Sequence, residues 1–566
     1  SNENLDFSDP RCGRFLNTIE LVSHYHAPLK EHILRHKKGQ VSYFSPLIQN
    51  EFLDIIAGKV RENIFCDIKA SKYFSIMFDC TPDVSHLEQM SQVLRYVKIT
   101  EQGPEVVESF IDFVKVGEKT GLGLSQEISE KIKKDGLDLK NCRGQCYDNG
   151  SNMAGKYKGV QSRILAENNL AYFVPCAAHS LNLVGANAAS MSGEVQSYFG
   201  TLNCLYNFFA SSTNRWEVLL KHVPLSLKLQ SNTRWSTKRE AVQVIYKHLG
   251  KIINALNDLR TSLTTSDETK TEAANLLKNV KQFEFIVLSC FWYKQLTRID
   301  IVNKLLQVEN ITIHRSAKHI SRLISELDSE RANYSNAAMK EAKEMATNLG
   351  LDPHFKVVRK RRKKRMFDEN AEDEAPEFSE EKKFQQQLLE IVDRILCELR
   401  ERFNSIQNIN HLFGFLNGAS FGTMSGDDLK AKAIELASKY KEDLDKDELA
   451  TEVESFKYHG LDLVPNIQTA NSIDLLKFLC VNKMEDVYPN IMTALRIFLT
   501  IPVSVASNER SFSKLKIIKN YLRNLTGQQR LTNLGIISIE HQVASKLCFS
   551  EIVSTFAARK ARKVKF

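Results

Sequence analysis

The sequence predicts an α/β protein in which a mixed sheet is interrupted by a large all-helical insertion, and three observations lead to that fold class. Three apolar runs with short polar links follow one another between residues 73 and 116, which is typical of an antiparallel meander. Helical and strand-like segments then alternate up to about residue 197. From about residue 198 to about 487 the apolar residues recur almost wholly at helical spacing, so we expect a separate helical insertion there.

Length and composition set the class of protein. A chain of 566 residues exceeds what one hydrophobic core usually serves, so we expect two or three structural units. Hydrophobic residues make up 43% and charged residues 26%, the balance of a soluble globular protein. We expect no membrane partner, since no apolar run is long enough to cross a bilayer. The 11 scattered cysteines favour a reducing compartment, and the net charge of +9 is compatible with a polyanionic partner without identifying one.

The elements can be placed in order along the chain. The first 70 residues are expected to be helical, since apolar residues recur at helical spacing between Ile48 and Val60. The elements that follow are strands at 73–79, 91–99 and 106–116, a helix at 123–134, a strand at 142–148, a helix at 152–168, a strand at 172–176 and a helix from 177 onward. Three strands followed by alternating helices and strands is the pattern of a ribonuclease-H-like sheet.

We therefore expect four segments along the chain. Residues 1–70 form an N-terminal helical lead-in, and residues 71–197 form the first part of a ribonuclease-H-like core. Residues 198–486 form the helical insertion, and residues 487–566 complete the core. Within the insertion, one face of a helix is marked by apolar residues at helical spacing, which are Phe384, Leu388, Ile391, Ile395, Leu399 and Phe403.

A block of positive charge lies within the insertion. Residues 356–365 (KVVRKRRKKR), which include Lys360, Arg361 and Arg362, carry eight positive charges and are followed by an acidic run at 368–381. Adjacent blocks of opposite charge are typical of an exposed loop. The basic half is a candidate nuclear-import signal or phosphate-contacting patch, and the alternative is a solvated loop without either role.

Two aspartates are candidate metal ligands. Asp79 ends the apolar strand SIMFD, and Asp148 closes a later strand directly before the turn sequence Asn149-Gly150. In a ribonuclease-H-like sheet such positions meet at one edge, where with a third carboxylate on a later helix they can hold two cations about 3.5–4 Å apart for phosphoryl displacement. Carboxylate oxygens suit Mg²⁺ or Mn²⁺. Taken singly, each is better explained as a turn or helix-cap aspartate, and it is the joint placement of the two that favours a metal site.

Five stretches carry a family resemblance. They are FSIMFDCTPDVSHLEQMSQVLRYV (74–97), GQCYDNGSNMAGKYKGVQSRI (144–164), VPCAAHSLNLV (174–184), SNTRW (231–235) and SNERSFSKLKIIKNYLRNLT (507–526). In this order they resemble the hAT superfamily of DNA transposases, and most of all the branch that includes zinc-finger MYM-type-1-like proteins. The resemblance covers nearly the whole chain. It implies a catalytic, metal-binding triad of Asp79, Asp148 and Glu509, separated by a helical insertion as seen here.

Glu509 is singled out only by the resemblance, because a Glu near the start of a helix is usually explained by the helix dipole and capping. Pro502 with Ser504 or Ser507 provides start signals for its helix. The residues expected to face inward are Val505, Phe512 and Leu515.

Two further pairs match family motifs. Cys176 and His179 match a C-x-x-H element, in which the resemblance implies that the His assists at the scissile phosphate or the flanking DNA. The alternative is a zinc site completed by Cys142 and Cys146, which we consider unlikely because the spacing is weak evidence.

The pair Arg234-Trp235 matches the family's Arg-Trp pair, whose Trp is implied to stack on a base displaced from the duplex. The alternative is a Trp that anchors helices of the insertion.

The segment from about 486 to 540 resembles the hAT C-terminal dimerisation region and implies self-association. By composition alone its apolar residues are ordinary core residues, namely Ile517, Ile518, Leu522, Leu525, Leu531, Leu534, Ile536, Ile537 and Ile539.

The resemblance implies a nuclear transposase that cuts DNA at transposon ends and joins it to a target, with no small-molecule substrate. One alternative is a domesticated, catalytically silent protein that acts by DNA or protein binding and dimerisation. Another is a simple nuclease, which would not need the insertion or the Arg-Trp pair. The Cys/His finger that precedes many hAT cores is not found before Phe74, so we expect the module that reads transposon ends to lie outside this chain.

Overall fold

The computed structural model describes residues 13–35, 43–225, 227–230, 235–308, 311–356, 379–464 and 466–559. The chain divides into two compact units, Ser1–Val174 with Phe415–Phe566 and Pro175–Gly414. The first is an α/β unit and the second is helical throughout its described residues. No helix in these described ranges is long and apolar enough to span a lipid bilayer.

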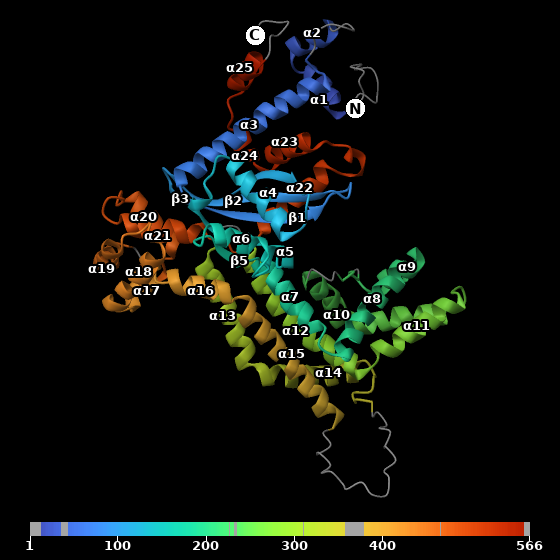
Figure 1. The fold of residues 1–566 in the computed structure, drawn as a ribbon. Helices are drawn as coiled ribbons and strands as arrows, with labels where there is room; N and C mark the ends of the chain where they lie inside the picture. The colour runs from blue at the N-terminus through green and yellow to red at the C-terminus, as the bar shows by residue number, and fades with distance from the viewer. Residues whose placement is uncertain are drawn as a thin grey trace. The chain divides into compact units, whose positions relative to one another are not determined.

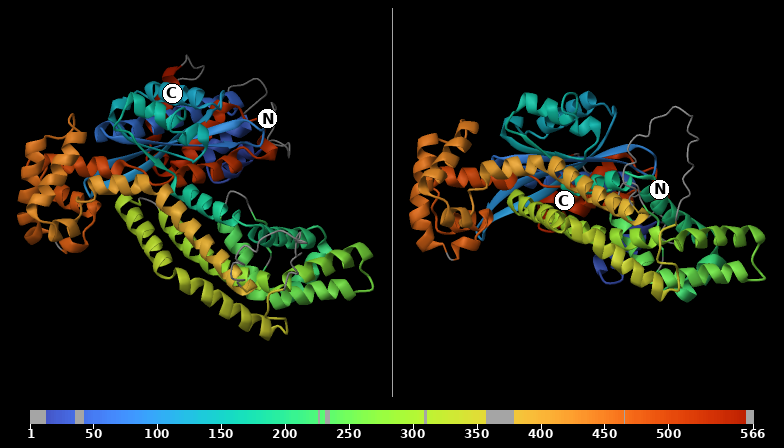
Figure 2. Two further views of the ribbon diagram at one scale, coloured as in Figure 1. Left: turned by 60° about the horizontal axis from the view of Figure 1, so that its bottom comes forward. Right: turned by 90° about the horizontal axis from the view of Figure 1, so that it is seen from below.

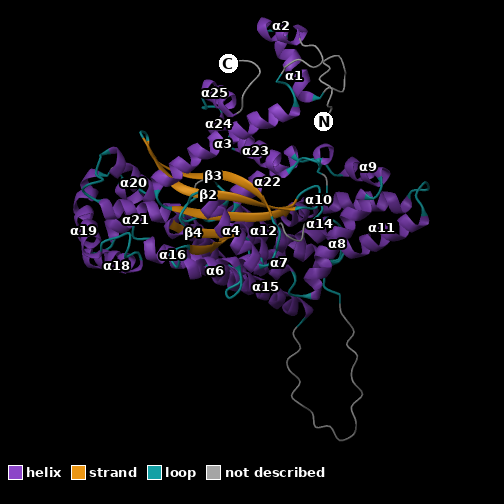
Figure 3. Ribbon diagram, turned by 45° about the horizontal axis from the view of Figure 1, so that its top comes forward, coloured by secondary structure: helices purple, strands orange, loops and turns teal. Residues whose placement is uncertain are grey.

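The first unit is built on one five-stranded mixed sheet with the order β3-β2-β1-β4-β5 (Figures 1 and 3). The central strand β1 runs antiparallel to β2 and parallel to β4, and β2 runs antiparallel to β3. The expected meander and mixed sheet are therefore confirmed. The strands are β1 (Phe74–Pro82), β2 (Glu88–Thr100), β3 (Gly103–Lys115), β4 (Cys142–Tyr147) and β5 (Tyr172–Pro175).

Helices cover both faces of the sheet. Helices α3 and α23 pack on β2 and β3, with α22 beside them, and Figure 2 shows α4 and α6 against the opposite face. Burial on both faces explains why Phe74–Phe78 is apolar without alternation, apart from Ser75. The helices of this unit that precede β5 in the chain are α1 (Arg14–Ser23), α2 (Ala27–Arg35), α3 (Pro46–Ser71), α4 (Gly121–Lys134), the 3-10 helix η1 (Leu139–Asn141), α5 (Ser151–Ala154) and α6 (Val160–Glu167).

The single helix expected at 152–168 is wrong, because the segment forms two short helices, α5 and α6, with a tight turn between Gly155 and Gly159. A Cβ on Gly155 would lie 2.5 Å from the carbonyl oxygen of Ser151, and one on Gly159 would lie 2.5 Å from the amide nitrogen of Gly155. Only glycine allows the backbone to approach itself this closely. The two glycines therefore break the helical pattern.

The second unit confirms the helical insertion. The expected apolar face at 384–403 is buried along α15. Its helices are α7 (Ala177–Ala189), α8 (Gly193–Ala210), α9 (Thr213–His222), α10 (Trp235–Thr261), α11 (Asp267–Val280), α12 (Phe283–Leu306), α13 (Ile313–Ser329), α14 (Arg331–Asn348), α15 (Glu380–Arg402) and α16 (Asn404–Phe413).

Residues 415–486 belong with the sheet although they are helical, so the structural division differs from the expected limits at 197/198 and 486/487. Helix α20 packs on β3 and α21 on β2. The helices after the insertion are α17 (Gly418–Thr423), α18 (Gly426–Lys439), α19 (Lys446–Leu463), the 3-10 helix η2 (Ile467–Thr469), α20 (Ser472–Val481), α21 (Pro489–Thr500), α22 (Ala506–Ile518), the 3-10 helix η3 (Tyr521–Arg523), α23 (Gln528–Ile539), α24 (His541–Ala544) and α25 (Phe549–Arg559).

A buried ion pair joins this helical part to the sheet. Arg143 in β4 contacts Asp443, which lies between α18 and α19, and each side chain is 3% exposed. The Tyr73 hydroxyl also donates to Asp443 at 2.9 Å, and the Arg143 guanidinium lies over the Tyr73 ring. Asp443 is also 3.5 Å from the Lys72 ammonium, whereas removal of Asp443 would leave the Arg143 charge buried without a counter-charge.

We expect Asp443→Asn to destabilise the α/β unit by about 3–5 kcal/mol, because the Arg143 charge would remain buried without a counter-charge. Thermal unfolding followed by circular dichroism would measure the change. Asp462→Asn on the exposed side of α19 is the control and should change stability by less than about 0.5 kcal/mol. Equal unfolding temperatures for the two variants would contradict this role of Asp443.

A buried carboxyl predicts a second change in stability. Glu540 accepts a hydrogen bond from the Phe110 amide at 2.6 Å, and burial raises the pKa of Glu540 to about 7. The folded protein therefore keeps this proton between about pH 4.5 and pH 7 while the unfolded chain loses it. Stability consequently falls as the pH rises through that window.

Glu540→Gln keeps the acceptor and removes the charge, so it should raise stability at pH 8 by about 1–3 kcal/mol and change it little at pH 4.5. Unfolding temperatures across this pH range test the expectation. Glu105→Gln, at an exposed position on β3, leaves Glu540 in place and should keep the pH dependence of the wild type. If the Glu540→Gln variant and the wild type have equal unfolding temperatures at every pH, burial of Glu540 does not raise its pKa.

Candidate functional site

Asp79 and Asp148 lie at one edge of the sheet on neighbouring strands. Asp79 is near the end of β1, and Asp148 directly follows β4. The strands are parallel with Met77 opposite Cys146, so continuing the register by two residues brings Asp79 opposite Asp148. Neighbouring strands are about 4.8 Å apart and side chains two residues on share a face. The two carboxylates therefore lie on the same face of adjacent strand ends.

Glu509 is on α22, whose first turns are fixed against the same strand end. The side-chain amide of Asn508 donates to the carbonyl of Met77 at 3.1 Å and to that of Ser91 at 2.8 Å. Ser91 is the β2 partner of Asp79 in the strand register. The hydroxyls of Ser91 and Ser511 are 2.8 Å apart and add a second link. Glu509, next to Asn508, is therefore positioned beside the part of β1 that carries Asp79.

The far end of α22 is held by a buried ion pair. The Lys519 ammonium is 2.6 Å from the Asp83 carboxylate, and the two side chains are 3% and 0% exposed. Asp83 lies in the turn between β1 and β2 and accepts the backbone amides of Ser85 and Leu87. The helix is therefore anchored at both ends to the hairpin that carries Asp79.

The start of α22 differs from the expectation in one respect. Val505 precedes the helix and no side chain caps it, so the expected capping by Ser504 or Ser507 is wrong. Ser507 donates instead to the Glu108 carboxylate of β3. The residues expected to face inward are buried as expected, namely Val505, Phe512 and Leu515.

The carboxylates act on one another electrostatically. Burial, and then the nearby charge of Asp148, raises the pKa of Asp79 to about 7, and Glu509 and Glu88 add to the rise. The Cys80 amide, which donates to Asp79 at 2.9 Å, lowers it only in part. Glu509 is therefore within electrostatic reach of Asp79, although 430 residues separate the two in the chain.

The donor chemistry of this edge fits a hard divalent cation, because all three candidate ligands are carboxylates and their mutual repulsion is what a cation would relieve. Within the described ranges, no group of three or more His, Cys, Asp or Glu side chains is close enough together to hold a metal ion. The three carboxylates are thus neighbours without closing around one point. The metal set of Asp79, Asp148 and Glu509 stays a prediction.

A cavity of about 270 Å³ opens beside Asp148 and adds two residues that the sequence did not reveal. Glu88 and Lys119 line it together with Cys80, and the Lys119 ammonium is 2.7 Å from the Glu88 carboxylate. Glu88 starts β2 opposite Pro82, at the same edge as Asp79. Only the strand register could have revealed Glu88, because nothing in its local sequence marks it.

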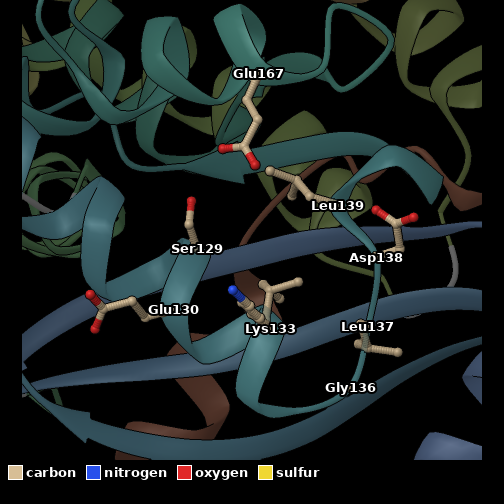
Figure 4. Close-up of a pocket in the computed structure, with 9 residues that line it drawn as sticks. Ser129, Glu130, Lys133, Gly136, Leu137, Asp138, Leu139 and Glu167 are labelled. Carbon is tan, nitrogen blue, oxygen red and sulfur yellow. The ribbon is translucent and has the colours of Figure 1, made fainter.

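A larger cavity, of about 540 Å³, lies at the other end of β4 (Figure 4). Its lining comes from α4, from the link into β4 and from Glu167 of α6, as Figure 4 shows. Asp138 and Leu139 at its rim precede β4, whereas Asp148 follows that strand. This cavity is therefore separate from the carboxylate edge.

The remaining candidate residues belong to the second unit or lie outside the described residues. Cys176 is buried directly before α7, and His179 is half-buried in its first turn. Trp235 is the first residue of α10. Arg234, Lys360, Arg361 and Arg362 lie outside the described residues. The roles expected for all of them stay predictions.

The two cysteines of the alternative zinc site are buried in β4 of the first unit. The Cys142 thiol donates to the Gly144 carbonyl, and burial raises the pKa of that thiol to about 12. Cys146 is equally buried in the strand. Metal binding would have to displace the proton of this thiol, because the thiolate is the binding form, and the zinc alternative stays a prediction.

Apolar residues from the last turn of α22 onward are not all core residues, which corrects the interpretation from composition. Ile517 is 67% exposed, Leu522 83% and Leu525 95%, and Tyr521 beside them is 82% exposed. Leu531 and Ile536 are fully buried and Ile518 is 8% exposed, as expected. The loop that contains η3 therefore presents apolar side chains to solvent, which a protein surface rarely does without a partner.

Comparisons with known proteins match two parts of this chain. Residues 6–159 match the ZMYM1/FAM200 RNase-like domain, and residues 452–543 match the hAT family C-terminal dimerisation region. Asp79 and Asp148 lie in the first matched region, and Glu509 lies in the second.

Two curated proteins, both called 52 kDa repressor of the inhibitor of the protein kinase, are similar along most of the chain. The protein from Homo sapiens is 25% identical over 524 residues, and that from Mus musculus is 25% identical over 525 residues. Each match covers 88% of this chain and 66% of the relative. The chain thus spans just under two thirds of the length of these relatives.

Proposed function

Because this hAT-related chain carries an RNase-like domain and a hAT C-terminal dimerisation region, we propose that it cuts DNA at transposon ends and joins the cut strand to a target. The observation that supports the proposal most is that Asp148 and Glu509 lie within electrostatic reach of Asp79 at one edge of the sheet. Mg²⁺ or Mn²⁺ held there would activate the attacking oxygen and stabilise the leaving oxygen. The proposed place of action is the nucleus.

The three side chains would contribute to metal binding in different ways, according to their positions. Asp79 and Asp148, on rigid neighbouring strands, would supply ligands with little freedom to move. Glu509 would close the set from α22, whose distance from the strands is set by Asn508. Asp79 must release its proton before it can act as a ligand, so binding of the cation should strengthen as the pH rises through about 7.

A second candidate is a domesticated protein that binds DNA and protein partners without cutting. It is favoured by the name of the two relatives, which is that of a repressor. It is also favoured by the open arrangement of the three carboxylates. In this case the same fold would serve as a scaffold for binding and self-association.

The first experiment incubates the purified protein and Mg²⁺ or Mn²⁺ with DNA that carries the terminal inverted repeats flanking its own gene. We expect nicked, hairpin and joined products, and a loss of about 100-fold or more in Asp148→Asn protein, the scale of removing an electrostatic group at the reacting centre. Asp138→Asn, at the other end of β4, is the control and should keep activity.

Persistence of these products in Asp148→Asn protein would overturn the assignment of the site. A wild-type protein that binds the DNA and yields no product with either metal would favour the silent alternative.

The exposed loop after α22 is a specific candidate for the self-association surface. Tyr521, Leu522 and Leu525 lie inside the matched dimerisation region, and the Ser85 hydroxyl donates to the Asn524 carbonyl at 3.0 Å. The β1–β2 turn beside this loop also exposes an apolar residue, Val84. We propose that a second copy of the chain covers this surface.

We expect Leu522→Ser with Leu525→Ser to raise the dimer dissociation constant by about 100-fold, because each buried leucine contributes about 1.5–3 kcal/mol. Sedimentation equilibrium measures the constant. Leu122→Ser, a 47% exposed leucine on α4, is the control and should leave it unchanged. An unaltered dimer in the double variant would place the interface elsewhere in residues 452–543.

A further inference from the structure

Helix α13 of the second unit carries a ridge of positive charge. Arg315, Lys318, His319 and Arg322 are spaced by three, four and seven residues, which places them on one side of the helix. Arg315, Lys318 and Arg322 are exposed, and His319 is half-buried. The opposite side of α13 is apolar and buried, through Ile313, Ile320, Leu323 and Leu327.

The two halves of α13 differ in how their charges are paired. In the C-terminal half, Glu326 is 2.8 Å from Arg298, and Asp328 is 3.1 Å from Arg400. In the N-terminal half, none of the cations Arg315, Lys318 and Arg322 forms an ion pair with any residue in the described ranges. The ridge is therefore positive charge that the described fold does not neutralise.

This arrangement costs the helix stability. Like charges three or four residues apart repel each other by about 0.2–0.5 kcal/mol per pair. Arg315 also lies in the first turn, at the positive end of the helix dipole, where cations are disfavoured. The crowding is visible at His319, whose pKa is lowered first by burial and then by the charges of Arg322, Arg315 and Lys318. A charge pattern that weakens its own helix is better explained by an external anion than by solvation.

We propose that the α13 ridge binds the phosphate backbone of DNA. Its three cations span about 10 Å along the helix axis, a length of about three base-pair steps along the axis of a duplex. The two arginines can form paired hydrogen bonds to phosphate oxygens. The inference rests on the proposed function only in taking DNA as the polyanion, and it adds a site distinct from Arg234 and from residues 356–365.

The test uses the full chain with Arg315→Gln, Lys318→Gln and Arg322→Gln combined. Binding to a 30-base-pair duplex is followed by fluorescence anisotropy in EDTA over a series of salt concentrations. The slope of log K against log salt should become shallower by about 2–3, since each phosphate contact contributes about 0.9, and affinity at low salt should fall about 10-fold or more. The unfolding temperature should stay the same or rise, because the repulsion within α13 is relieved.

Two further variants make the outcome specific. Lys278→Gln, Lys340→Gln and Lys382→Gln combined remove three exposed lysines of other helices of the same unit that form no ion pair within the described ranges, and should change the slope by less than 1. Arg315→Lys with Arg322→Lys keeps the charges and should keep the wild-type slope.

The proposal is overturned if the triple α13 variant retains the wild-type slope, or if it loses no more than the lysine control. It is also overturned if the variant keeps DNA binding and loses binding to polyglutamate, since the ridge would then serve an acidic peptide. Because the assay contains EDTA, its result is independent of cleavage. A protein that binds through α13 and does not cut would contradict the catalytic proposal alone.

Discussion

The repulsion between carboxylates at the edge of the sheet is the constraint on which the site depends. Three acidic side chains that are far apart in sequence are brought within electrostatic reach, and burial, together with the charges of Asp148 and Glu509, raises the pKa of Asp79 to about 7. A protein gains no stability from such crowding, since each ionised carboxylate disfavours the next. Like-charge clusters that persist at the end of rigid strands are most readily explained by a cation that neutralises them.

The scaffold holds these groups together by bonds that are themselves buried. Asn508 and the Lys519–Asp83 pair fix both ends of α22 to the β1–β2 hairpin, while Arg143 and Asp443 fix the opposite end of the sheet to the helices that precede α22. None of these contacts is local in sequence. The carboxylates are therefore positioned by the folded unit as a whole.

Much of the first unit could be predicted from local patterns. The strand order follows from apolar runs and turn residues, and Asp79 and Asp148 stand out because each ends a strand. Glu509 has no comparable local signal and was found only by resemblance. Glu88 and Lys119 were missed because their position depends on strand register, which periodicity does not reveal.

The errors have equally physical causes. The break between α5 and α6 depends on two close backbone contacts at Gly155 and Gly159, whereas the surrounding residues suit a continuous helix. Leu522 and Leu525 were expected in the core because composition does not separate a buried apolar residue from an exposed one. The ion pairs of α13 could not be predicted from the sequence either, since the partners of Glu326 and Asp328 lie on other helices.

The most direct test of the central claim is a titration of the full chain with Mn²⁺, followed by electron paramagnetic resonance at pH 8 in the wild type and in Glu509→Gln and Asp79→Asn proteins. The account predicts saturable binding in the wild type that weakens by about 10-fold or more in both variants, because each removes one ligand from a shared set. Wild-type protein without saturable binding, or variants that bind as tightly as the wild type, would contradict it.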